Sequence, residues 1–98
     1  MAKYDLTPSA LEDLYSIWEY SVTTWSEDQA DKYYRQLDAG MNEIGDSPLS
    51  TGKVYDEIRP GLLGYRIRKH VVFYTIRPNG RVLIVRILHE SMDFPSHF

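Results

Sequence analysis

Arginine and histidine residues gather in the second half of this chain, in a combination that can act on a phosphate group. They are Arg66, Arg68, His70, Arg86 and His89. Arginines bind phosphate through charge-assisted hydrogen bonds, and a neighbouring histidine can carry a proton near neutral pH. A metal-free ribonuclease needs these groups. The alternative is structural, with Arg86 and His89 paired to acids or a chain end and His70 in a turn. Residue types alone favour this structural alternative over a ribonuclease site.

Other kinds of catalytic site lack the residues that they require. The sequence has no cysteine, three separated histidines, no glycine-rich phosphate loop and no His-Glu-x-x-His motif, so neither a metal nor a cofactor is expected. Glu12, Asp13 and Glu19 are expected mainly on the solvated face of a helix. The chain begins without an apolar run and contains none near the roughly 18 residues of a membrane span. With the missing cysteines, this predicts a cytoplasmic protein with no membrane contact.

The formal net charge of −3 conceals an uneven distribution. Residues 1–50 contain ten acidic and three basic residues, whereas residues 51–98 contain four acidic and eight basic residues. An acidic and a basic region in one small protein indicate a charged partner. The simpler interpretation is that strand-edge arginines keep a sheet soluble, and charge alone slightly favours it.

The first half predicts two helices joined almost without a linker. Thr7-Pro8 starts the first, because threonine is a good N-cap and proline suits the first helical position. Ser26 and Gln29 form a capping box that starts the second, which ends at Gly45 and Ser47-Pro48. Apolar residues at helical spacing predict one stripe on each helix. The stripes are Leu11, Leu14, Tyr15, Trp18, Val22 and Trp25, and then Ala30, Tyr33, Tyr34, Leu37, Met41 and Ile44.

The remaining segments predict strands. A short strand at residues 3–6 precedes the helices, and residues 54–58 form a strand or an extended segment before a turn at 59–61. Residues 65–68, 71–76 and 82–88 are further strands, with a hairpin turn at 78–80 and a polar tail from residue 90. The helices must cover the apolar face of the sheet. We therefore predict one α+β domain over residues 1–98, with an N-terminal strand and an antiparallel helical hairpin packed on an antiparallel sheet.

Aromatic residues on the helices allow two interpretations. Trp18, Tyr33 and Tyr34 are most simply core residues. However, two helices on one sheet leave a groove open between the layers, and an exposed apolar groove usually marks a partner site that a helix fills. The groove indicates a binding protein without identifying its partner.

Several segments together resemble the ParE toxins of the RelE/ParE superfamily. Residues 86–93 are similar to the family's Arg-Ile/Val-Leu-His-x-x-Met-Asp signature. Residues 56–61 resemble the segment before its central strands, and residues 70–74 resemble its His-hydrophobic-hydrophobic-Phe-Tyr strand. Parts of residues 6–30 resemble its helical hairpin, so the resemblance spans nearly the whole chain in the correct order.

This resemblance implies the fold predicted above and also a function. ParE toxins act on DNA gyrase, trap its cleaved DNA complex and block replication, which is not an enzymatic activity of the toxin itself. A co-expressed antitoxin silences them. Its C-terminal segment wraps the toxin, partly in the groove between helices and sheet, and its N-terminal part is commonly a DNA-binding dimer, here expected to be of ribbon-helix-helix or similar type. Direct sequence-specific nucleic-acid binding by the toxin is not expected.

The RelE branch shares the fold but cleaves mRNA on the ribosome, and this alternative stays open. Val71 stands where RelE carries an arginine, and no tyrosine follows Tyr74, which argues against RNA cleavage, although His89 is present. The chain also departs from many ParE relatives, with Leu62-Leu63 in place of Tyr-Arg and Arg68-Lys69 in place of Gly-Ser. A third possibility is a family member that only binds its antitoxin and modulates transcription.

Two sets of site residues follow from these interpretations. Toxicity is assigned to the hairpin tip, the last strand and the tail, at Arg68, Lys69, Arg86, His89, Met92 and Asp93. Antitoxin binding is assigned to core candidates beside the groove, at Leu14, Trp18, Tyr34, Leu37 and Tyr65. A ribonuclease would instead use Arg68 and Arg86 to bind phosphate and His89 to carry a proton.

Overall fold

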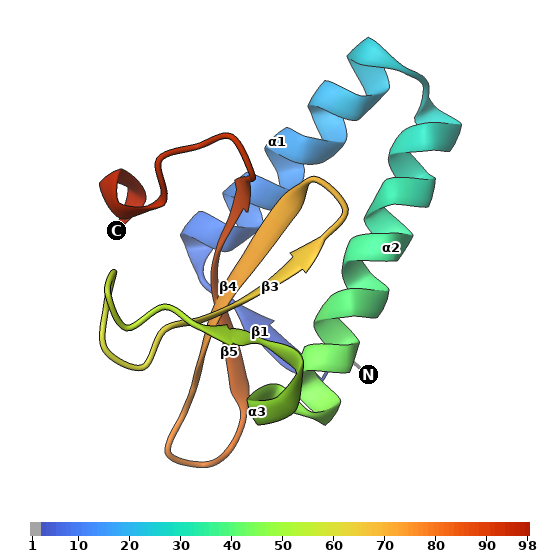
Figure 1. The fold of residues 1–98 in the computed structure, drawn as a ribbon. Helices are drawn as coiled ribbons and strands as arrows, with labels where there is room; N and C mark the ends of the chain where they lie inside the picture. The colour runs from blue at the N-terminus through green and yellow to red at the C-terminus, as the bar shows by residue number, and fades with distance from the viewer. Residues whose placement is uncertain (1–2) are drawn as a thin grey trace.

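Two antiparallel helices pack on a five-stranded sheet in the computed structural model, which describes residues 3–98 (Figure 1). The elements follow in the order β1 (Tyr4–Leu6), α1 (Pro8–Thr24), α2 (Glu27–Asp46), α3 (Pro48–Thr51), β2 (Lys53–Val54), β3 (Leu63–Ile67), β4 (His70–Ile76), β5 (Val82–His89) and the 3₁₀ helix η1 (Phe94–His97). The predicted α+β class and helical hairpin are confirmed. Among the described residues, no helix is both long enough and apolar enough to cross a membrane.

Both helices begin at the predicted caps. The Thr7 side chain accepts a hydrogen bond from Ala10 N at 3.0 Å, and the Ser26 side chain accepts one from Gln29 N at 3.1 Å. Each bond satisfies a backbone N–H that has no partner inside the helix. The turn between the helices is therefore specified locally.

The strand order is β1-β5-β4-β3-β2, and β3, β4 and β5 form an antiparallel meander. The sequence predicted an antiparallel sheet, but one pair of strands is parallel. β1 pairs in parallel with β5, with Tyr4 opposite Val82 and Leu6 opposite Ile84. The connection between β1 and β5 runs through the helical hairpin and then through β2, β3 and β4, so the first strand of the chain lies beside the last. Parallel neighbours need such a long crossover connection.

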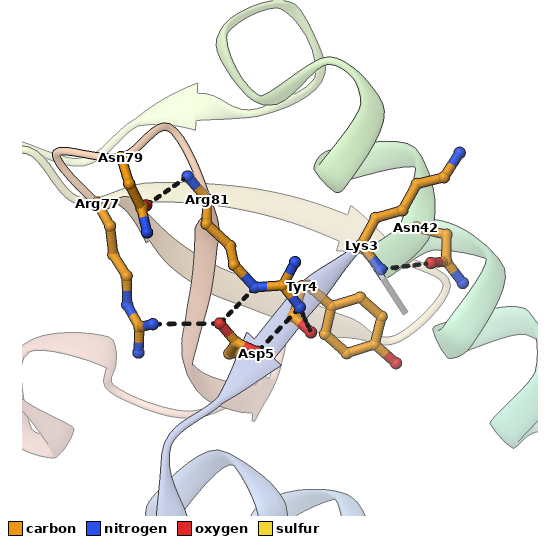
Figure 2. Close-up of polar contacts among 7 residues, drawn as sticks. All are labelled: Lys3, Tyr4, Asp5, Asn42, Arg77, Asn79 and Arg81. Atoms are coloured by element: carbon orange, nitrogen blue, oxygen red, sulfur yellow. Dashed lines mark hydrogen bonds and ion pairs between the residues drawn. The ribbon is translucent and has the colours of Figure 1, made fainter. Parts of the chain in front are cut away.

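Residues of the β4–β5 turn hold β1 at this edge (Figure 2). Arg81 forms a two-point bridge to Asp5, with Nε–Oδ2 at 2.6 Å and Nη2–Oδ1 at 3.0 Å. Arg77 Nη1 donates to Asp5 Oδ2 at 3.1 Å, so one carboxylate holds two arginines. These hydrogen bonds keep the pKa of Asp5 below its ordinary value.

The buried face of α1 differs from the predicted stripe. Ala10, Leu14 and Ser21 are buried, whereas Leu11 and Tyr15 are 57% and 62% exposed. Trp25, also assigned to the stripe, is exposed as well. The helical period was correct, but α1 is rotated so that the row one position earlier faces the sheet. Small residues in that row allow close packing, and the Ser21 hydroxyl is satisfied by the Ile17 carbonyl at 2.8 Å.

Apolar side chains cover both faces of the sheet. The main core lies under the helices and includes Leu37, Met41 and Tyr74. A second cluster on the other face is formed by Leu62, Val71, Phe73 and Leu88, with Tyr55, Ile58, Val85, Phe94 and Phe98 packed against it. The prediction of a simply polar tail was therefore wrong, because its two phenylalanines cover this face.

The segment after β2 contributes to the same cover. The sequence predicted a strand or extended segment over residues 54–58, but pairing stops at Val54 and residues 56–61 form turns. Tyr55 N donates to Leu62 O at 2.8 Å, and Gly61 N donates to Asp56 Oδ1 at 2.9 Å. Gly61 has a φ of 81°, which glycine adopts without strain, so the predicted turn at 59–61 is confirmed.

Candidate functional site

The β3–β4 tip and the turn after β5 lie together at one end of the sheet. His70 on β4 pairs with His89 on β5, and Glu90 N donates to Lys69 O at 2.8 Å. Met92 N in turn donates to His89 O at 3.0 Å. This register brings Lys69, His89 and Met92, which were separate in the sequence, into one region beside Arg68. We call residues 66–70 and 89–92 the basic end of the sheet.

A tyrosine and two histidines form the base of this region. Tyr33 Oη on α2 lies 2.6 Å from His70 Nδ1, and the rings of His70 and His89 meet edge to face with centroids 5.2 Å apart. Burial lowers the pKa of His70 to about 4, and the positive charge of a protonated His89 acts in the same direction. His70 is therefore neutral at pH 7 and connects α2 to the sheet.

His89 presents one ring nitrogen for a ligand. Its Nδ1 accepts a hydrogen bond from Ser91 N at 3.1 Å and lies 2.7 Å from Ser91 Oγ. Because a backbone N–H donates to Nδ1, the hydrogen of the neutral ring sits on Nε2. His89 is thus oriented to donate a hydrogen bond from Nε2.

The cations at the basic end differ in their contacts. Arg66 Nη2 bridges to Glu90 Oε1 at 2.8 Å, and its Nε donates to Arg68 O at 3.0 Å. Arg68 and Lys69 are exposed, and within residues 3–98 neither side chain has a hydrogen bond or ion pair. Arg68 has a φ of 57°, a left-handed conformation that disfavours side chains other than those of Gly, Asn and Asp.

Arg86 is engaged inside the fold, away from the two free cations. Its Nε and Nη2 donate to Asp13 Oδ2 and Oδ1 at 2.7 and 2.9 Å, and its Nη1 donates to His97 O at 3.1 Å. This is the arrangement that the structural alternative described, with Arg86 bound to an acid and to the tail. Asp93, also assigned to toxicity, is exposed and begins η1, where its carbonyl accepts from Ser96 Oγ at 2.8 Å.

A groove of about 390 Å³ lies between α1 and α2. It is lined by Leu11, Leu14, Tyr15, Trp18, Asp31 and Tyr34. Trp18 Nε1 donates to Asp31 Oδ1 at 3.2 Å and connects the two helices. The groove was expected between helices and sheet, whereas all the residues that line this groove belong to α1 and α2.

The groove contains three of the five residues predicted to bind an antitoxin, namely Leu14, Trp18 and Tyr34. Leu37 is fully buried in the core, and Tyr65 lies on β3 with its hydroxyl bonded to Glu43 Oε2 at 3.2 Å. Sequence reasoning missed Leu11 and Tyr15 as groove residues because both were assigned to the core. The available signal was that α1 has more apolar residues than one buried stripe needs.

No cluster of three or more His, Asp or Glu residues within residues 3–98 is arranged to hold a metal ion. The fold and its surfaces thus define a class: a small α+β protein with an apolar groove along a helical hairpin and a basic end on the sheet. Both features are surfaces on which a partner can dock.

Comparison with known proteins places this chain in a family. Residues 4–94 match the family described as "ParE toxin of type II toxin-antitoxin system, parDE". The chain is similar to "Toxin ParE1" of Mycobacterium tuberculosis, with 35% identity over 92 residues that cover 94% of this chain and 93% of the relative. It is also similar to "Toxin ParE1" of Caulobacter vibrioides, with 38% identity over 97 residues that cover 99% and 98%. The chain therefore belongs to the ParE toxins of type II toxin–antitoxin systems.

A solved structure shows the same fold. The structure is titled "Chromosomal ParDE TA system from P. aeruginosa", and the alignment has a TM-score of 0.75 at 16% identity. It covers 91% of this chain and 98% of the other. At this identity the likeness establishes the architecture alone.

Proposed function

We propose that this toxin inhibits DNA gyrase by binding it, without a catalytic step of its own, and that a co-expressed antitoxin silences it from the groove between α1 and α2. The observation that carries the proposal is the ParE family match over residues 4–94. The action on gyrase is what the resemblance to ParE toxins implies.

The composition of the groove supports an antitoxin helix as its occupant. Leu11, Tyr15 and Tyr34 expose 57%, 62% and 43% of their surface there, which the free chain leaves in water. An amphipathic helix buries such a surface with its apolar face. Asp31 lines the groove, and Glu12 and Glu19 are exposed on α1, so the antitoxin segment is expected to carry basic residues beside its apolar ones.

The basic end of the sheet supports inhibition by binding rather than by RNA cleavage. The ribonuclease alternative requires Arg68, Arg86 and His89 to act on one phosphate. Arg86 is bound to Asp13 and to the His97 carbonyl, and His70 is neutral and bonded to Tyr33. Of the proposed nuclease groups, Arg68 and His89 are left to bind a partner.

The test of the gyrase step is a cleavage assay with purified toxin, gyrase, supercoiled plasmid and ATP. We expect linear DNA after denaturation, and we expect it to disappear when antitoxin is added. Folded toxin that yields no linear DNA would contradict the proposal. A parallel assay on ribosome-bound mRNA then decides the alternative, because discrete cuts are expected only from a ribonuclease.

The antitoxin step has a matched pair of variants. Tyr15 and Tyr20 are both exposed tyrosines on α1, at 62% and 67%, but only Tyr15 lines the groove. Tyr15→Ala is expected to weaken antitoxin binding at least tenfold, and Tyr20→Ala to leave it unchanged, as measured by calorimetry. Equal effects of the two substitutions would place the antitoxin elsewhere.

A further inference from the structure

We propose that the β3–β4 tip binds the phosphate backbone of double-stranded DNA through Arg68 and Lys69, independently of base sequence. The choice of DNA over RNA rests on the proposed action on gyrase, which holds a DNA duplex. This contact is compatible with the expectation that the toxin reads no specific sequence, because backbone phosphates carry no sequence information.

Arg68 and Lys69 are the two basic side chains of residues 51–98, all of which are described, that have no ion pair and no cation–π contact. The six others are each held by a carboxylate or an aromatic ring. They are Lys53 with Tyr55, Arg59 with Phe98, Arg66 with Glu90, Arg77 and Arg81 with Asp5, and Arg86 with Asp13. The tip is therefore the part of this half of the chain where two adjacent cations have neither an ion pair nor a ring contact.

The turn that displays these cations is formed at an energetic cost. Arg68 has a φ of 57°, a left-handed conformation that is unfavourable for an ordinary side chain and costs glycine almost nothing. A strained backbone position is a pointer to function when the residue placed there has a use in that conformation. Here the strained residue and the next one, Arg68 and Lys69, are both exposed cations in the turn between β3 and β4.

The surroundings of the tip favour a backbone phosphate over a base or a protein surface. Aromatic stacking drives binding to unpaired bases, but residues 66–70 contain no tyrosine, tryptophan or phenylalanine. A protein interface has an apolar centre, and within residues 66–70 the exposed side chains are Arg66, Arg68 and Lys69. The neighbouring His89, whose Nδ1 accepts from Ser91 N, adds a hydrogen-bond donor at Nε2.

Two cations produce weak binding with a defined salt dependence. Each phosphate contact contributes a slope of about −0.9 to the logarithm of the binding constant against the logarithm of salt concentration, so we expect roughly −2. The net charge of −3 opposes binding elsewhere on the surface. The tip is therefore expected to strengthen the binding of the toxin to gyrase with its DNA, and not to hold DNA tightly in the absence of gyrase.

The experiment is a titration of isotope-labelled toxin with a short DNA duplex, followed by amide chemical shifts. We expect the shifts to be confined to residues 66–70 and 89–91 and to vanish as salt is raised. The double variant Arg68→Asn with Lys69→Gln should lose them, and asparagine tolerates the left-handed turn. The control is Lys32→Gln with Arg35→Gln on α2, which removes the same charge from exposed helical positions and should bind as the wild type does.

The outcomes separate this inference from the proposed function. Shifts elsewhere, shifts that persist in the tip variant, or binding to polyglutamate but not to the duplex would overturn it. Tighter binding to an RNA duplex would overturn the choice of DNA. If the toxin poisons gyrase equally well with and without the tip cations, the proposed function is retained and the DNA-binding inference is rejected. If the tip binds DNA but the toxin causes no DNA cleavage by gyrase, the DNA-binding inference is retained and the proposed function is rejected.

Discussion

Arg86 and Asp13 join the last strand to the first helix through two parallel hydrogen bonds. Nε–Oδ2 and Nη2–Oδ1 are 2.7 and 2.9 Å, and Asp13 Oδ2 also accepts from Ile87 N at 3.0 Å. The side chains are 24% and 15% exposed, so water screens the bridge only partly. Asp13 satisfies a backbone donor of β5 beyond the end of β1, where none of the strands formed by residues 3–98 covers that edge. Arg86 therefore has a structural role, because it links β5 to α1.

Arg86→Met is expected to lower the free energy of unfolding by about 2 kcal/mol, because it leaves the mostly buried Asp13 carboxylate without its cation. Chemical denaturation measures the loss. The control is Arg77→Met, which removes an exposed arginine from an acid that Arg81 still holds. Similar losses in the two variants would show that the Arg86 bridge is no stronger than a surface pair.

His70 predicts a decrease in stability under mildly acidic conditions. Its pKa is about 4 in the folded state and about 6.5 when unfolded, so between these values the unfolded chain binds a proton that the native protein does not. Stability should fall as pH drops from about 6.5 to about 4, by up to about 3 kcal/mol. His70→Gln should flatten this part of the profile. Parallel profiles for the two proteins would exclude His70 as the source.

Arg68→Gly is expected to raise stability by about 1 kcal/mol. Glycine removes the strain of the left-handed backbone, and this gain exceeds the entropy that it loses on folding. Lys69→Gly is the matched control, because Lys69 has an ordinary negative φ and the same substitution should destabilise the protein. The two melting temperatures should therefore move in opposite directions. A decrease for Arg68→Gly would indicate that the arginine is not strained.

Phe98→Ala is expected to destabilise the fold by about 1–2 kcal/mol, because the ring covers part of the second face of the sheet. Its centroid lies 5.2 Å from that of Phe73, and Arg59 lies over it. Thermal unfolding and binding of an apolar dye measure the loss of cover. Met92→Ala, at an exposed position of the same tail, should have little effect. Unchanged unfolding of Phe98→Ala would mean that the tail does not contribute to the core.

Structural features that depend on only a few neighbouring residues could be predicted from the sequence. Thr7 and Ser26 cap helices because their side chains reach backbone N–H groups three residues on. The turn at Gly61 follows from a conformation that glycine favours. The ordered series of family motifs also predicted the fold before any contact was known, and the family match over residues 4–94 agrees.

Contacts between distant residues were decided only by the tertiary structure. The helical period of α1 was predicted correctly, but which side of α1 is buried depended on its packing against α2 and the sheet. Leu11 and Tyr15 therefore lie in the groove and not in the core. The register of β4 and β5 brought His70 and His89 together, and Phe98 reached Phe73 across the sheet. Arg86 was a toxicity candidate because of the C-terminal family motif, yet its bond to Asp13 joins positions far apart in the chain. No local pattern encodes such a pairing, because its energy exists only after the helix and the strand have met.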